Sequence, residues 1–301
     1  MKVIKKWRRF NQSIKFIWNH PLVKVERLKA LFRYFSFHIL TRINNAEKSI
    51  PFIESTKITI RRDLSGIATN YYTYLADFEE MMFLLHSLSE NDWFLDIGSN
   101  VGTWVVLASG VTECKSIAKE PVKETYHKLI ENINLNNIQS KVHTDNIALG
   151  EVESEVNISR SRGALNRILD SKQSDIELVH QKTLDDITIE KSPAIIKIDV
   201  EGYEMQILRG GKRTLSNPEL QSIIIELKGN ALKYGFSDED IHHILTRYGF
   251  IPVIYAPFSR KLKQLPNFNT KSSNTIYVRN IQNTEKIVRA SRQYQVGKYR
   301  V

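Results

Sequence analysis

The sequence predicts an α/β fold built on a doubly wound, mostly parallel β-sheet, and three patterns lead to this prediction. An apolar run at residues 93–97 precedes a glycine-rich turn with Gly98 and Gly102, as in a buried strand that leads into a helix. A second strand-like run ends in an acid at Glu120, and a later run, residues 194–198, is followed by further carboxylates. Strands that alternate with helices favour a parallel sheet with its ligand at the carboxyl ends of the strands.

The glycine-rich turn is the first candidate ligand site. Gly98 and Gly102 permit a tight turn and a close approach of the backbone to a ligand. The helix that begins behind the turn offers free N–H groups to an anionic group. Asp96, at the end of the strand, adds a negative charge suited to a cationic group of the ligand. Two glycines at this spacing also occur in tight turns without a ligand, so the turn alone is weak evidence.

The position of Glu120 strengthens the prediction of a nucleoside site. Glu120 lies 24 residues beyond Asp96, at the end of the second predicted strand. A βαβ nucleoside site places its ribose-binding carboxylate about 20 residues after the glycine turn, at this strand end. The alternative is an ordinary surface charge. The third predicted strand, residues 142–149, carries Asp145 and Asn146, which either face an adenine edge or stabilise a turn.

A group of acids follows the fourth and fifth predicted strands. Asp199 and Glu201 end the fourth strand, and Glu226 ends the fifth. Carboxylates at this edge of a parallel sheet face the ligand crevice. Two final strand-like runs, residues 250–255 and 275–278, predict an antiparallel strand pair at the C-terminal end of the sheet.

Residues 1–50 carry the whole excess of positive charge. They hold 12 lysines and arginines against two glutamates, so this excess equals the net charge of +10 of the entire chain. The remaining 251 residues are balanced, and we expect no nucleic-acid partner for them. Apolar residues recur at helical spacing from Trp7 to Trp18 and from Leu28 to Ile39, with basic residues between them. This favours helices that lie on an anionic membrane surface. Docking on the rest of the chain, a homodimer contact, and binding of RNA or another acidic partner are the alternatives.

Composition predicts the cellular compartment and the kind of membrane attachment. The single cysteine, Cys114, excludes an internal disulfide and a cysteine-based metal site, and favours a reducing cytoplasm. No apolar run reaches the roughly 18 residues that a membrane-spanning helix needs, and the N-terminus shows no apolar core of a signal peptide. We therefore expect a cytoplasmic protein that binds the inner face of the membrane peripherally.

Taken in order, these motifs resemble those of the FkbM-type methyltransferases, a family of class I S-adenosylmethionine-dependent enzymes. The resemblance spans roughly residues 60–280. It departs from the family at Lys119, where an aromatic or apolar residue is usual, and this places a cation near the predicted ribose site. The residues that carry the resemblance are FLDIGSNVG at 94–102, Glu120-Pro121, NINLNN at 132–137, ALG at 148–150, TLDD at 183–186 and IKIDVEG at 196–202.

The resemblance implies a domain organisation. Residues 51–280 would form the methyltransferase domain, a Rossmann-like doubly wound sheet with the C-terminal antiparallel strand pair that such enzymes have. Residues 1–50 would form a basic amphipathic helical arm. Residues 281–301 would form a basic polar tail that is loosely held.

The resemblance also implies the roles of the candidate site residues. Asp199, Glu201 and Glu226 are the candidates for the general base or for contacts to the acceptor hydroxyl. Three acids at neighbouring strand ends could also hold Mg²⁺, as in catechol-type methyltransferases with a similar fold, but we favour a site without metal. The residues expected to bind S-adenosylmethionine are Asp96, Gly98, Asn100, Gly102, Glu120, Asp145 and Asn146.

We therefore expect an O-methyltransferase that acts on a sugar hydroxyl of a surface glycan, lipopolysaccharide or glycolipid precursor, since family members with such an N-terminal extension are similar to enzymes of bacterial surface-glycan gene clusters. One alternative is a nicotinamide-dependent oxidoreductase, against which the Gly-x-x-x-Gly spacing argues. The other is a non-catalytic membrane-docked module with the same fold. The presence of Asp96, Glu120 and Asp199 argues against this second alternative.

Overall fold

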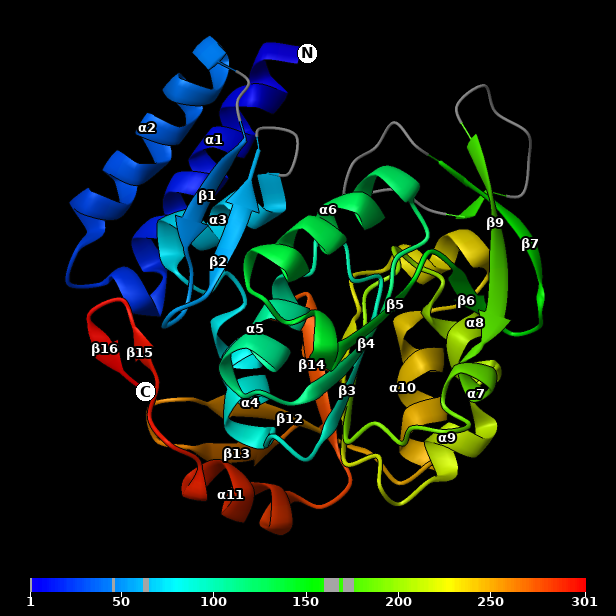
Figure 1. Cartoon of the computed structure of the whole chain (residues 1–301). Helices are drawn as coiled ribbons and strands as arrows, with labels where there is room; N and C mark the ends of the chain where they lie inside the picture. Colours follow the sequence, from blue (N-terminus) through cyan, green and yellow to red (C-terminus); the bar gives the residue numbers. More distant parts are fainter. Residues whose placement is uncertain (1, 45–46, 62–64, 160–167, 170–175) are drawn as a thin grey trace. The chain divides into compact units, whose positions relative to one another are not determined.

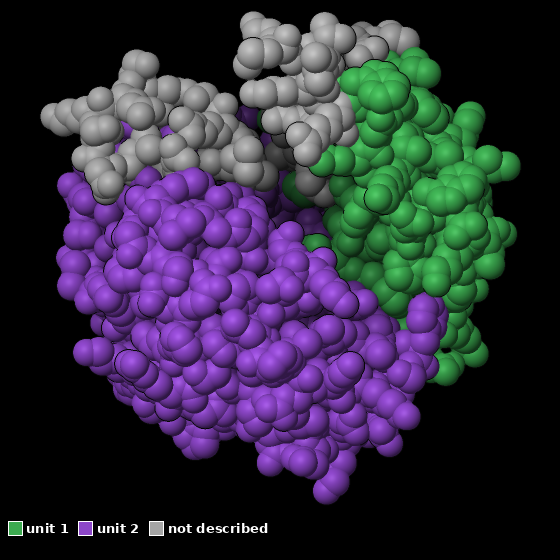
Figure 2. Space-filling model, turned by 180° about the vertical axis from the view of Figure 1, so that it is seen from behind, with its two compact units in different colours: residues 1–78, 293–301 green, residues 79–292 purple. Residues whose placement is uncertain are grey.

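The computed structural model describes residues 2–44, 47–61, 65–159, 168–169 and 176–301 (Figure 1). The chain divides into two compact units, Met1–Phe78 with Gln293–Val301, and Glu79–Arg292. Figure 2 colours the two units separately. The first unit thus extends beyond the arm expected at residues 1–50, and it includes nine residues from the other end of the sequence.

The unit Glu79–Arg292 is built on a mixed sheet that has eight strands among the described residues. The order across the sheet is β5 (Val142–Asp145), β4 (Lys115–Lys119), β3 (Trp93–Ile97), β10 (Ile195–Ile198), β11 (Ser222–Glu226), β14 (Asn274–Val278), β12 (Ile251–Ala256) and β13 (Lys261–Gln264). The first five strands in this order run parallel, and β14 lies antiparallel between β11 and β12. The prediction of a doubly wound sheet with an antiparallel end is confirmed.

Helices cover both faces of this sheet (Figure 1). Fully buried isoleucines and leucines of the central strands pack under them, because a parallel sheet that is covered on both sides needs apolar residues in both directions. One face carries α4 (Phe78–Ser87), α5 (Thr103–Val111) and α6 (Lys123–Leu135). The other carries α7 (Leu184–Ile187), α8 (Glu204–Arg209), α9 (Lys212–Ser216) and α10 (Asp238–Arg247).

The predicted third strand, residues 142–149, is wrong in its length. The strand β5 ends at Asp145, and the chain turns at Asn146, whose side chain donates hydrogen bonds to the backbone carbonyls of Glu120 and Pro121, just after β4. Residues 148–150 belong to a separate four-stranded sheet in the described part of the chain. Most of the arginine-rich segment 159–167 lies outside the described residues. The second sheet has the order β6 (Ala148–Gly150), β9 (Ile176–Thr183), β7 (Ser154–Ser159) and β8 (Ile168–Leu169).

The first unit contains the predicted helical arm. Two long helices, α1 (Lys2–Asn19) and α2 (Arg27–Asn44), are separated by a short 3₁₀ turn at Pro21–Val23, where the sequence breaks the helical pattern. No helix among the described residues is long and apolar enough to cross a bilayer. The unit also holds β1 (Lys48–Pro51), β2 (Lys57–Ile60), α3 (Ser65–Thr73), β15 (Gln295–Val296) and β16 (Tyr299–Arg300).

The prediction that residues 281–301 are loosely held is wrong. Residues 281–290 form α11 (Ile281–Ala290), which begins with an Asn280 side chain that accepts a hydrogen bond from the Asn283 amide. Thr284 and Val288, one helical turn apart, are buried. We predicted a loose tail because its composition is mostly polar. This i, i+4 pair nevertheless packs one face of the short helix, whose start is capped.

Candidate active site

The glycine turn has the tight backbone that its sequence predicts. Gly98 and Gly102 have φ angles of +77° and +83°, and Asn100 between them has φ of +51°. A β-carbon at Gly98 would lie 2.0 Å from the Asp199 carbonyl oxygen, and one at Gly102 would lie 2.5 Å from Leu129 Cδ1. A β-carbon is therefore excluded at Gly98, where it would meet backbone, and is disfavoured at Gly102 by the positive φ angle, and the turn brings the backbone after β3 against the end of β10.

Asp96 is a fully buried carboxylate at the end of β3. Neither of its oxygens receives a hydrogen bond from any residue that the structure describes. Burial raises the pKa of Asp96 to about 6, against the opposing effect of the Lys197 ammonium on the neighbouring strand. Because an unpaired buried carboxylate is costly, this arrangement is typical of a site that is completed by a cationic group.

Glu120 is buried beside the glycine turn and is fixed by the backbone. Its two carboxylate oxygens accept hydrogen bonds from the amides of Asn100 and Val122, each at 2.9 Å. Burial raises the pKa of Glu120 to about 7. Each oxygen keeps a further lone pair, so the carboxylate can still accept hydrogen bonds from two neighbouring hydroxyls, such as those of a ribose.

Asp145 and Asn146 both have partners within the protein. The Asp145 carboxylate forms an ion pair with the buried ammonium of Lys119, so the cation that departs from the family pattern has its own counter-charge. The Asn146 amide donates to the carbonyls of Glu120 at 2.9 Å and Pro121 at 2.8 Å. Asn146 thereby holds the backbone that carries Glu120, so of its two predicted roles the structure shows the stabilisation of a turn. A contact between Asp145 and an adenine edge stays a prediction.

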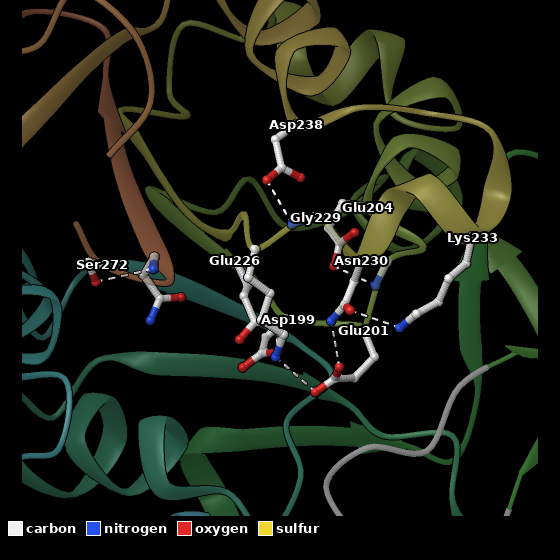
Figure 3. A network of polar contacts seen from close by, with 12 residues as sticks. Asp199, Glu201, Glu204, Glu226, Gly229, Asn230, Lys233, Asp238 and Ser272 are labelled. Atoms are coloured by element: carbon white, nitrogen blue, oxygen red, sulfur yellow. Dashed lines mark hydrogen bonds and ion pairs between the residues drawn. The ribbon is translucent and has the colours of Figure 1, made fainter. Parts of the chain in front are cut away.

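The three candidate acids come together at the carboxyl edge of the sheet (Figure 3). One carboxylate oxygen each from Asp199, Glu201 and Glu226 lies within 4.8 Å of the others. They come from the ends of β10 and β11 and from the turn before α8, as their positions in the sequence predicted. Glu201 has a φ angle of +57°, a conformation that a non-glycine residue rarely adopts and that is common at functional sites.

Two lysines supply positive charge within this acid cluster, which we define as Asp199, Glu201 and Glu226. Lys197 Nζ lies 3.0 Å from Asp199 Oδ2, so this lysine of β10 pairs with one of the three acids. Lys228 Nζ lies 2.6 Å from Glu226 Oε2 and 3.2 Å from Glu201 Oε1. Sequence reasoning missed Lys228, although its i, i+2 spacing from Glu226 at a strand end places both side chains on one side of the chain.

Sequence reasoning also missed Asn230, whose side chain holds Glu201 in its rare backbone conformation. The Asn230 amide donates to Glu201 Oε2 at 2.8 Å, and Lys233 in turn donates to Asn230 Oδ1 at 2.8 Å (Figure 3). Nothing in the spacing of these residues indicates the contact, because it depends on how the 3₁₀ segment Asn230–Tyr234 returns toward the turn before α8.

The surroundings of Asp199 and Glu226 shift the pKa values of the two carboxyl groups in opposite directions. Burial acts to raise the pKa of Asp199, but Lys197 together with Lys228 and Glu226 outweighs it and holds this pKa below its usual value. Burial and the negative charge of Asp199 raise the pKa of Glu226 to about 8, although Lys228 opposes them. The surroundings thus favour the ionised form of Asp199, whereas burial and the charge of Asp199 favour the protonated form of Glu226, and pairs of acids with such opposite shifts are typical of acid–base sites.

The donor set of the acid cluster would also suit a divalent cation. The positive charge that the structure shows in the cluster comes from Lys197 and Lys228. Acidic clusters without a metal are common, and binding of Mg²⁺ here stays a prediction.

Fold and site together define a class I methyltransferase-type α/β protein whose acids Asp96, Glu120 and Asp199 lie at the carboxyl ends of β3, β4 and β10. The chain belongs to the FkbM methyltransferase family, since the sequence pattern of the methyltransferase FkbM domain matches residues 96–252, just over half of the chain.

Comparison with a curated relative and with solved structures gives more distant likenesses. Hexuronic acid methyltransferase AglP of Haloferax volcanii is 25% identical over 166 residues. This match covers 54% of the chain and 65% of the relative, so the chain spans less than two thirds of that protein. A precorrin-6y C5,15-methyltransferase from Geobacter metallireducens shares 10% identity over 67% of this chain and 87% of its own, with a TM-score of 0.40. An rRNA methylase from Streptococcus thermophilus shares 14% identity over 66% and 91%, with a TM-score of 0.37.

Proposed function

We propose that the protein is an S-adenosylmethionine-dependent O-methyltransferase whose acceptor is a sugar hydroxyl in a surface glycan, lipopolysaccharide or glycolipid precursor. The observation that carries the cofactor assignment is Asp96, a fully buried carboxylate without a hydrogen-bond partner in the described chain. A cationic ligand group at this point would offset the cost of its burial.

The residues around the glycine turn fit the cofactor in three respects. Asp96 suits the ammonium of its amino acid end, Glu120 suits its two ribose hydroxyls, and the positive φ angles of Gly98 and Gly102 give the tight turn between these two acids. When bound, S-adenosylmethionine supplies an electrophilic methyl group on a positively charged sulfur. The negative charge of Asp96 and Asp199 at this edge of the sheet favours such a cation.

The acid cluster suits the acceptor side of the reaction. Asp199, ionised beside Lys197, accepts the proton that the acceptor hydroxyl loses. The protonated Glu226 donates a hydrogen bond to the acceptor oxygen or to Asp199. Holding the hydroxyl oxygen in one position supplies much of the rate in such a displacement. The name of the relative from Haloferax volcanii supports a sugar acid as the acceptor class.

The first test of this proposal is calorimetric titration of the purified protein with S-adenosylhomocysteine, beside NADH. We expect S-adenosylhomocysteine to bind and NADH not to bind, with binding abolished in Asp96→Asn and retained in the surface control Glu90→Gln. A preference for NADH, or equal binding by the Asp96 variant, would overturn the cofactor assignment.

The second test concerns the acceptor. With S-adenosylmethionine and oligosaccharides that contain hexuronic acid, we expect a product heavier by one added methyl group, with the methyl located on oxygen by mass-spectrometric fragmentation. In Asp199→Asn we expect turnover to fall by about 10²–10⁴-fold, the usual contribution of a general base, while S-adenosylhomocysteine still binds. Turnover retained in Asp199→Asn would remove this residue as the base.

A further inference from the structure

Helix α2 carries apolar side chains on two opposite faces. One face is formed by Ala30, Tyr34 and Phe37, which are buried in the first unit. The other face has residues at i, i+4, i+7 and i+11, so they line one side of the helix. We call this face the exposed stripe, and its side chains are 77%, 72%, 44% and 57% exposed, in the order Leu28, Phe32, Phe35 and Ile39.

Helix α1 extends the exposed stripe. Its residue Phe10 is 39% exposed, and the Phe10 ring lies 6.2 Å from the ring of Phe35, so the two helices share one apolar surface. Trp7 and Trp18 of α1 are 67% and 41% exposed. Tryptophan prefers the boundary between water and lipid, because its ring is apolar and its N–H is polar.

The charge of the same unit indicates which partner this surface fits. Residues 1–50 carry 12 basic side chains against two acidic ones, and both glutamates form ion pairs with arginines. Among the basic side chains that the structure describes, Lys15, Lys24 and Lys29 are exposed. A second copy of the chain would bring an equal positive excess against this one, whereas an anionic surface would be attracted to it.

We propose that α1 and α2 dock the protein on a bilayer that contains anionic phospholipids. The exposed stripe enters the headgroup region, and the basic side chains contact lipid phosphates. Since no described helix can cross the bilayer, the attachment is peripheral. The inference is independent of the methyl-transfer site, because it rests on residues of the first unit alone.

The test is co-sedimentation of the whole protein with lipid vesicles. We expect binding to vesicles of phosphatidylcholine with phosphatidylglycerol, little binding to phosphatidylcholine alone, and loss of binding in high salt. The variant Leu28→Ser/Phe32→Ser removes two apolar side chains from the stripe, and we expect its partitioning to weaken at least about tenfold. The matched control Leu178→Ser/Leu232→Ser removes two side chains that are 60% and 68% exposed in the other unit, and it should bind like the parent.

Two further measurements keep the test decisive. The variant Lys24→Glu/Lys29→Glu should bind phosphatidylglycerol vesicles more weakly, and thermal unfolding should show that all variants are folded. Equal vesicle binding by Leu28→Ser/Phe32→Ser and the control would overturn the proposal. It would also be overturned if the parent bound no vesicles and formed a dimer by light scattering that Leu28→Ser/Phe32→Ser converts to a monomer, since the stripe would then be a contact between copies.

Discussion

Gly98 faces the backbone of Asp199 so closely that a β-carbon at position 98 would lie 2.0 Å from the Asp199 carbonyl oxygen. The two residues belong to motifs that are far apart in the sequence, and the parallel pairing of β3 with β10 brings them together. The glycine turn and the acid cluster are therefore coupled through main-chain atoms, and a displacement of one displaces the other.

This contact predicts that Gly98→Ala destabilises the protein and abolishes binding of S-adenosylhomocysteine. The new methyl group would meet backbone atoms that cannot rotate away, and the φ angle of +77° adds strain. The control is Gly249→Ala, where φ is +81° but a β-carbon meets no described atom within 4 Å. This control should cost only about 1–2 kcal/mol of backbone strain. Urea unfolding and calorimetry measure both effects, and equal losses in the two variants would contradict the prediction.

Asp96→Asn should stabilise the protein at pH 8 while it removes cofactor binding. The folded-state pKa of about 6 lies above the ordinary value of 3.8, so the folded state holds the proton more tightly than the unfolded state. The ionised Asp96 therefore lowers stability increasingly as pH rises from about 4 to about 6, and by a constant amount above that range. A gain of roughly 2–3 kcal/mol at pH 8 that vanishes near pH 4 is expected from thermal unfolding. A variant less stable than the parent at pH 8 would refute this account.

The affinity for S-adenosylhomocysteine should rise with pH through about 7. Only the ionised form of Glu120 can accept hydrogen bonds from two hydroxyls, and burial raises its pKa to about 7. Glu120→Gln should bind more weakly and lose this rise, because an amide has only one acceptor oxygen. Calorimetry between pH 6 and pH 8.5, with Glu90→Gln as the control, measures the slope. A slope that persists in Glu120→Gln would assign it to another group.

Removal of divalent metal should leave methyl transfer unchanged. Lys197 and Lys228 supply positive charge to the acid cluster, so a metal ion is not needed to offset its carboxylates. Activity is compared before and after dialysis against EDTA, with and without added Mg²⁺. Loss of activity that Mg²⁺ restores would show that the cluster is a metal site.

The elements that position the site could be predicted from the sequence because each depends on local pattern. The buried strand before Gly98 and the strand that ends at Asp199 consist of short apolar runs followed by turn residues, and they lie where they were expected. The position of Glu120 follows from the regular length of a βαβ unit. Parallel strands end at one edge, so the meeting of Asp199 with Glu226 was predictable as well.

The parts that could not be predicted depend on contacts between distant segments. The strand β5 ends early because the Asn146 amide donates hydrogen bonds to the carbonyls of Glu120 and Pro121, just after the end of β4. Asn230 reaches Glu201 only through the path of a 3₁₀ segment, which has no spacing rule. Val288 lies in a mostly polar tail, and its burial depends on the surface that α11 packs against. Hydrophobic periodicity gives no information about the contacts of Asn146 and Asn230.

Residues 293–301 complete a unit that residues 1–78 begin. The backbone groups of Tyr294 and Val301 exchange hydrogen bonds of 2.9 and 3.1 Å, and Gly297 lies against the Tyr74 ring, where a β-carbon would come within 2.5 Å. During translation the ribosome adds this hairpin only after all of residues 79–292 have been made. The first unit therefore lacks the contacts of this hairpin until residues 293–301 have been made.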